Sequence, residues 1–197
     1  MIHYFTNREA AEKLEINLAR WKRWSRSFLP PDPLGGMQSG YARQYLFKDL
    51  IKVYLGGYLL SHLRLSVAES LAVINDLSPW MKKNGYFAPN GWGGGAAAAG
   101  CAPGNHQIYF SPMRTRGLEN GTAFRYLVRQ TIQRQADESC APGCVVERYV
   151  ETCINGNAAD GHALLQDPEV RLVNLGTVLQ TLVEKLHGSA RQSDQSE

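Results

Sequence analysis

The sequence lacks a long apolar run. Its most apolar stretch, around Val53 to Leu60, is far too short to cross a bilayer. The first residues do not have the pattern of a signal peptide, so we expect a cytoplasmic protein without a membrane span. Charged residues make up 20% and hydrophobic residues 44% of the 197 positions. This composition excludes intrinsic disorder and predicts a folded core.

Cysteine is also scarce. Four cysteines in a chain of this length do not form a disulfide framework, so we expect reduced thiols. Cys140 and Cys144 have the spacing of paired thiolate ligands, and Cys101 lies near His106 in the sequence. Zinc or another soft metal is therefore a candidate ligand of Cys101, Cys140 and Cys144. The alternative is that these are turn cysteines without a ligand, and no cofactor is assigned.

A recognisable catalytic motif is absent. Residues 91–96 match the glycine spacing of dinucleotide sites, but no strand pattern precedes them and no helix pattern follows. Asp160 beside His162, and Glu147 with Glu151, lack an accompanying nucleophile motif. We therefore predict that the protein is not an enzyme.

Positive charge is concentrated in the N-terminal part of the chain. Residues 1–84 carry twelve Lys and Arg against seven Asp and Glu, a balance of +5. Residues 85–197 carry nine against eleven, a balance of −2. In the stretch 91–104, eleven of fourteen residues are Gly or Ala, which is typical of a linker. These shifts predict a basic domain over 1–84, a linker or loop over 85–105, an α+β domain over 106–188 and a disordered tail over 189–197.

The basic domain begins with a pattern for two short helices. Thr6 and Glu9 have the spacing of a capping box, which predicts a helix from about Asn7 to Leu14. Asn17 can cap a second helix after a tight turn. Two short helices separated by such a turn outline a helix-turn-helix.

The second predicted helix is strongly basic and has no acidic residue. Leu18, Trp21 and either Trp24 or Phe28 recur at helical spacing and can face the first helix. The residues left outside are Arg20, Lys22, Arg23 and Arg26. Such a helix fits a groove flanked by phosphates, and the alternative is an ordinary solvated surface helix.

A glycine-rich segment follows the prolines that end this helix. It predicts a small β-hairpin, or wing, in which Tyr41, Arg43 and Tyr45 lie on one side and can contact a sugar-phosphate backbone. A third helix is predicted over about 47–62. Ser66 begins a fourth helix, which we expect to end before Pro79.

The order of these parts resembles the DNA-binding domain of the MerR family of transcriptional regulators over residues 4–77. The segments that carry the resemblance are YFT at 4–6, INLARWKRW at 16–24, SFLPP at 27–31, GYARQYLFKDL at 40–50 and LRLSVAESLAVI at 63–74. The resemblance implies a winged helix-turn-helix that binds operator DNA through its second helix and its wing, with RNA polymerase as a further candidate partner. DNA contacts are accordingly expected from Asn17, Arg20, Lys22, Arg23, Arg26, Tyr41, Arg43 and Tyr45.

Two other functions are compatible with the same pattern. The winged helix can be a docking surface for a protein or a ligand, because the charge excess is modest. The chain can also be an excisionase-like architectural factor, which bends DNA without sensing a signal. In the preferred interpretation the protein is a sequence-specific regulator of transcription, and the C-terminal domain is its effector or dimerisation part.

The C-terminal domain is predicted from weaker signals. Residues 106–110 read as a strand, whereas 124–132 and 145–154 each fit either a strand or a helix. We favour strands because β-branched and aromatic residues dominate both segments.

The last element carries a leucine stripe. Its leucines follow a three, four, three, four spacing, the seam of a short coiled coil, at Leu172, Leu175, Leu179, Leu182 and Leu186. We expect this helix to contribute to a homodimer, and the alternative is that it packs on its own domain. The predicted fold is therefore an α-helical winged helix-turn-helix domain joined by a linker to a smaller α+β domain with a leucine-striped last helix.

Overall fold

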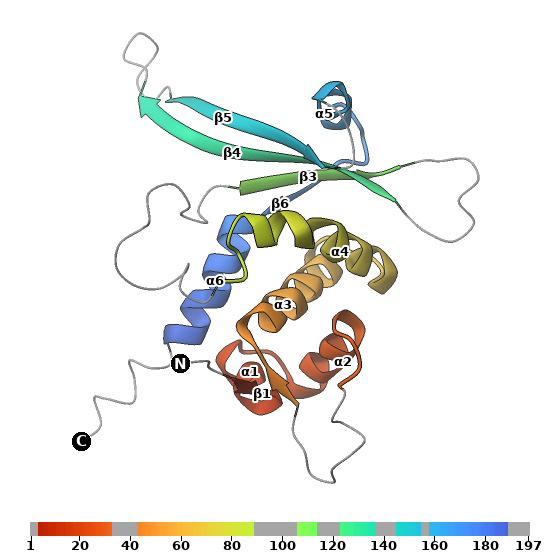
Figure 1. Cartoon of the computed structure of the whole chain (residues 1–197), viewed down its shortest axis with the longest axis vertical. Helices are drawn as coiled ribbons and strands as arrows, with labels where there is room; N and C mark the ends of the chain where they lie inside the picture. The colour runs from red at the N-terminus through yellow and green to blue at the C-terminus, as the bar shows by residue number, and fades with distance from the viewer. Residues whose placement is uncertain are drawn as a thin grey trace. The chain divides into compact units, whose positions relative to one another are not determined.

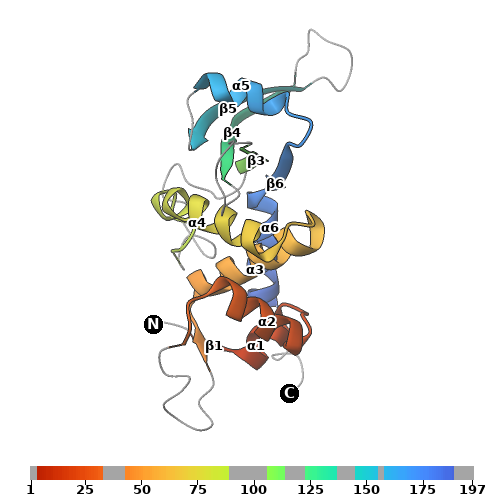
Figure 2. The same cartoon turned by 90° about the vertical axis from the view of Figure 1, so that its right-hand side faces the viewer.

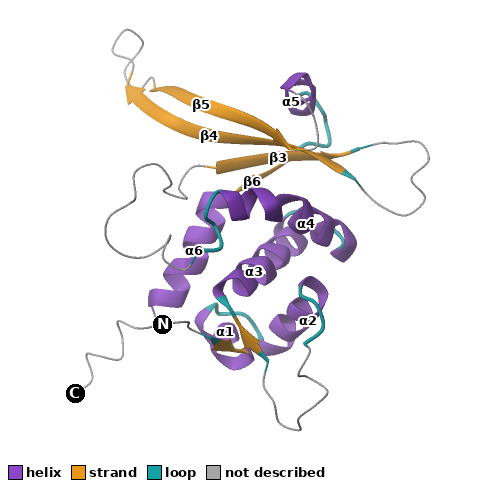
Figure 3. Cartoon of the chain, in the orientation of Figure 1, coloured by secondary structure: helices purple, strands orange, loops and turns teal. Residues whose placement is uncertain are grey.

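The chain folds into a mixed α/β structure with six helices and two antiparallel sheets among its described residues (Figure 1, Figure 3). The computed structural model describes residues 4–32, 43–88, 106–113, 123–136, 145–154 and 158–188. These residues form two compact units. The first contains residues 4–88 as described together with 178–188, and the second contains 106–177 as described. The predicted boundary therefore differs from the observed one, because most of the last helix belongs to the first unit.

The first unit opens with the predicted pair of short helices. Strand β1 (Phe5–Thr6) leads into α1 (Asn7–Lys13). The capping box is confirmed: the Glu9 N–H donates to Thr6 Oγ1 at 3.2 Å, and the Thr6 N–H donates to Glu9 Oε2 at 2.7 Å. A turn then leads into α2 (Leu18–Phe28), which Asn17 caps as predicted.

The segment after α2 returns to the start of the chain. Strand β2 (Gln44–Tyr45) pairs antiparallel with β1 and places Tyr45 opposite Phe5. Both of these side chains are buried, which stabilises a pairing between segments about forty residues apart. This pairing was not predicted from the sequence. Tyr41 and most of the predicted wing lie outside the described residues.

Two longer helices complete this part of the first unit. Helix α3 (Phe47–His62) has the predicted bounds. Helix α4 (Val67–Lys83) starts at the predicted capping box but continues through Pro79, so the predicted end was wrong. An internal proline costs about 3 kcal/mol, whereas burying one large apolar side chain yields about 1.5–3 kcal/mol. The buried face of α4 extends from Leu77 before the proline to Met81 after it, which explains why the helix persists.

The second unit is built on a four-stranded sheet with the order β5-β4-β3-β6, in which all neighbours are antiparallel. Its strands are β3 (His106–Pro112), β4 (Phe124–Ala136), β5 (Val145–Ile154) and β6 (Arg171–Asn174). The preference for strands over helices in the two ambiguous segments is therefore confirmed.

The two faces of this sheet are different. One face carries the buried aromatic residues Phe110, Phe124 and Tyr126, whose ring centroids lie 5.7–6.3 Å apart. Helix α5 (Ala158–Leu165) packs on the other face, where Gly161 lies close to the side chains of Cys153 and Leu127. No helix in the described part of the chain is long and apolar enough to cross a membrane.

The last helix, α6 (Leu175–Gly188), does not present its leucines to a partner. Leu172 belongs to β6 and is exposed, because the helix begins three residues later than the leucine pattern. The other four leucines are buried within the chain itself: Leu175, Leu179, Leu182 and Leu186. These four leucines are therefore not available as a dimer seam in this fold, and the homodimer itself stays a prediction.

Candidate nucleic-acid interface

Helix α2 is anchored through one buried face. Trp21 is fully buried, and its ring meets Tyr45 edge to face at a centroid distance of 5.5 Å. The Tyr45 hydroxyl donates to Asn7 Oδ1 at 2.7 Å and lies 3.1 Å from Ser25 Oγ. Tyr45 was expected to contact DNA, but it is 1% exposed. It is instead a core residue that joins β2 to both α1 and α2.

A close approach between α2 and α3 fixes the same face. A Cβ atom at Gly56 would lie 2.5–2.7 Å from ring atoms of Phe28, and one at Gly57 would overlap the ring of Trp24. Only glycine at these two positions allows the aromatic rings to reach the α3 backbone. This role was not predicted, although two adjacent glycines within a helical pattern are a signal for close packing.

The opposite face of α2 is a continuous basic surface, which we call the α2 basic face. It consists of the exposed residues Arg20, Lys22, Arg23 and Arg26. At about 100° per residue, these side chains cover an arc of roughly 160° opposite Trp21 and Phe28. The helix contains no acidic residue. Within the described part of the chain, none of the four forms an ion pair, and Arg26 donates only to its own helix, at Lys22 O.

Two of the predicted contact residues have structural roles beside this face. Asn17 Oδ1 accepts from the N–H groups of Ala19 at 3.0 Å and Arg20 at 3.3 Å, so helix capping uses its oxygen and leaves its amide donors. Arg43 Nη2 donates to Pro30 O at 2.9 Å, and its guanidinium carbon lies 5.6 Å from the centre of the Tyr45 ring. Arg43 therefore ties the end of α2 to β2.

Leu18 also differs from the prediction. It was expected to face the first helix, but it is 39% exposed. Trp21 and Phe28 fill the buried face instead. The exposed start of α2 therefore combines one apolar side chain with the basic residues that follow it.

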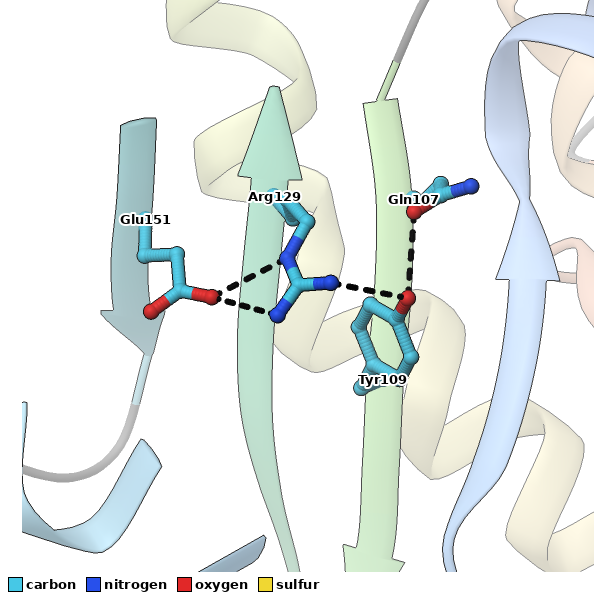
Figure 4. Close-up of polar contacts among 4 residues, drawn as sticks. All are labelled: Gln107, Tyr109, Arg129 and Glu151. Atoms are coloured by element: carbon cyan, nitrogen blue, oxygen red, sulfur yellow. Dashed lines mark hydrogen bonds and ion pairs between the residues drawn. The ribbon is translucent and has the colours of Figure 1, made fainter. Parts of the chain in front are cut away.

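The arginines of the sheet unit contrast with the α2 basic face. Arg129 donates to Glu151 Oε1 through Nε at 3.0 Å and Nη2 at 2.8 Å, and its Nη1 lies 3.5 Å from the Tyr109 hydroxyl (Figure 4). That hydroxyl in turn donates to Gln107 Oε1 at 3.1 Å. Arg125 pairs with Asp167 at 2.6 Å. These two guanidinium groups are engaged within their own sheet unit, whereas the four cations of the α2 basic face have no ion-pair partner among the described residues.

The predicted metal ligands Cys101, Cys140 and Cys144 all lie outside the described residues. Among the residues that the structure does describe, no group of three or more His, Cys, Asp or Glu side chains could hold a metal ion. Cys153, on β5, is a partly buried free thiol. Zinc binding by the other cysteines stays a prediction.

Comparisons with known proteins do not identify a family for this chain. No protein-family model matches the chain, and no curated protein is significantly similar to it. Its function is therefore inferred from the geometry of its residues.

Proposed function

We propose that the chain binds double-stranded DNA through the α2 basic face and acts as a regulator of transcription of the MerR type. The observation that carries this proposal is a helix with a buried aromatic face on one side and, on the other, four exposed cations that form no ion pair with any described residue. Phosphate contacts supply most of the affinity of DNA-binding proteins. Cations without an internal partner are available for such contacts at no cost in broken ion pairs.

The dimensions of α2 support insertion into the major groove. That groove is about 12 Å wide and admits an α-helix, whose diameter with side chains is about 10–12 Å. In helix-turn-helix proteins the first residues of the recognition helix contact base edges. Arg20, Lys22 and Arg23 occupy these positions, and arginine or lysine pairs well with guanine O6 and N7. Arg26 is in the last turn, where a phosphate contact fits better.

The remaining parts take supporting roles in this proposal. Arg43, at the base of the segment predicted as a wing, is placed beside the end of α2 by its bond to Pro30 O. The sheet unit would act as the effector-binding or interaction part, because two of its described arginines, Arg125 and Arg129, are already paired with carboxylates of the same unit.

The test compares two double variants that remove the same charge. Arg20→Ala/Arg23→Ala changes the α2 basic face, and Lys82→Ala/Lys83→Ala removes two exposed lysines from the end of α4 in the same unit. Fluorescence anisotropy with a mixed-sequence duplex, followed over a range of salt concentrations, gives the affinity and its salt slope. The first variant should bind much more weakly, with a salt slope shallower by about 0.9 for each phosphate contact removed. The second should stay close to the parent.

Equal affinities for the two variants would contradict the proposal, because general charge rather than α2 would then carry binding. A parent protein with no salt-dependent binding to duplex DNA would also contradict it. In that case a protein or ligand partner for the same helix becomes the better explanation.

A further inference from the structure

The C-terminal helix contacts the turn between α1 and α2. The Lys185 ammonium forms an ion pair with the Glu15 carboxylate, and its Nζ lies 3.5 Å from Leu14 O. In the other direction, Lys13 Nζ donates to Leu186 O at 3.2 Å. All of these residues belong to the first unit, and Figures 1 and 2 both show the end of α6 near α1 and α3. Each of the two helices thus contributes one lysine that contacts the end of the other: Lys185 of α6 reaches the residues after α1, and Lys13 of α1 reaches the last turn of α6.

The turn has features that need such support. Glu15 has a φ of 55°, in the left-handed region, where a residue with a side chain is held only by surrounding contacts. The hydrogen bond and the charge of Lys185 lower the pKa of Glu15 below its ordinary value, which favours the ionised carboxylate that the contact needs. Lys13 satisfies a carbonyl in the last turn of α6, where intrahelical partners are missing.

Helix α6 also continues directly from the sheet. Strand β6 ends at Asn174, which pairs with Gln107 of β3, and α6 begins at the next residue. Asn174 Oδ1 accepts from the Thr177 N–H at 3.2 Å, which stabilises the start of the helix. The chain therefore runs from a hydrogen-bonded strand into the helix that holds the α1–α2 turn, without an intervening loop.

We propose that Lys185 and Lys13 are positioning residues for DNA binding. By fixing the α1–α2 turn from α6, they hold α2 in the orientation that presents its basic face, and they make DNA affinity depend on a helix continuous with the sheet. The inference rests on the proposed function, because it concerns the same α2 surface. Loosening the turn lowers the fraction of molecules that are competent to bind, and the apparent Kd rises by the inverse of that fraction.

The first experiment uses Lys185→Met with Lys82→Met as its matched control. Both substitutions remove one positive charge from the same unit, but Lys82 is an exposed residue of α4, away from the α1–α2 turn. Lys185→Met should raise the Kd for duplex DNA measurably, by up to about five-fold, the upper limit expected from losing an exposed ion pair. Lys82→Met should change it less. Lys185→Arg, which keeps the charge and the donors, should restore most of the affinity.

A second readout does not require DNA. Native-state hydrogen exchange should be faster in Lys185→Met at the Ile16 and Arg20 amides, which bond to Ala11 O and Asn17 Oδ1. Exchange at buried α3 amides such as that of Val53 should be unchanged, which distinguishes a loosened turn from a destabilised unit.

The inference is overturned if the parent binds DNA while Lys185→Met and Lys82→Met have the same affinity. It is also overturned if exchange at the turn is unchanged in Lys185→Met. If the parent does not bind DNA but exchange at the turn still increases, the proposed function fails while the hold of α6 on this turn is supported.

Discussion

Gly56→Ala sets two effects of opposite sign against each other in the contact between α2 and α3. Alanine favours a helix over glycine by about 1 kcal/mol. The new Cβ atom, however, would lie 2.5 Å from Cδ2 and 2.6 Å from Cε2 of Phe28. Phe28 is only 4% exposed, so its ring has no solvent-filled space to enter. Overpacking of this kind costs about 1–3 kcal/mol, and the net expected loss of stability is therefore up to about 2 kcal/mol.

The free energy of unfolding, measured with denaturant, tests this expectation in a double-mutant cycle. Phe28→Leu removes the ring that the new methyl group meets, so Gly56→Ala should cost less in that background than in the parent. Gly57→Ala is a useful comparison, because it meets Trp24, which is only partly buried and can shift. If Gly56→Ala stabilises the parent by the full helix preference of about 1 kcal/mol, the packing of α2 on α3 is looser than the structure indicates.

Two further substitutions test the core role of Tyr45 and the effect of the buried His106 on stability. Tyr45→Phe should lower the free energy of unfolding by about 1 kcal/mol, because it removes the hydroxyl that bonds to Asn7; a weaker affinity for DNA with unchanged stability would instead favour the predicted wing contact. Burial lowers the pKa of His106 below its ordinary value of 6.5, against a partly compensating hydrogen bond to Gln130. The unfolded state therefore takes up the proton first, so stability should fall as the pH drops below about 6.5. His106→Gln should flatten this pH dependence in denaturant unfolding measured at several pH values.

Local signals in the sequence predicted the start of the first unit well. The capping boxes at Thr6 and Ser66, and the cap at Asn17, each give the observed helix start. Such caps depend on residues three positions apart, so the sequence contains the whole interaction. The exposure of the basic residues of α2 was also predictable from the local sequence. Helical spacing places the aromatic residues on one buried face, and the remaining positions are then exposed to solvent.

Interactions between distant segments were not predictable in this way. Tyr45 has an aromatic ring and a hydroxyl, and alternation along an extended segment places it equally well on a DNA-binding surface or in the core. Its burial depends on pairing with Phe5, forty residues earlier. Pro79 is a comparable case: the local rule ends the helix there, whereas tertiary burial of Met81 extends it. In both cases packing outweighs a preference that is correct for the isolated segment.

The leucine stripe of α6 shows what a periodic pattern determines. A three-four spacing requires one apolar face to be covered, but it does not identify the element that covers it. Here the chain's own fold buries Leu179, Leu182 and Leu186, while Lys185 on the same helix reaches Glu15. A homodimer built on that stripe would have to remove α6 from the first unit and break its hold on the α1–α2 turn. A two-fold complex on DNA would therefore have to form through a different surface, with α6 left in place to hold the turn that precedes α2.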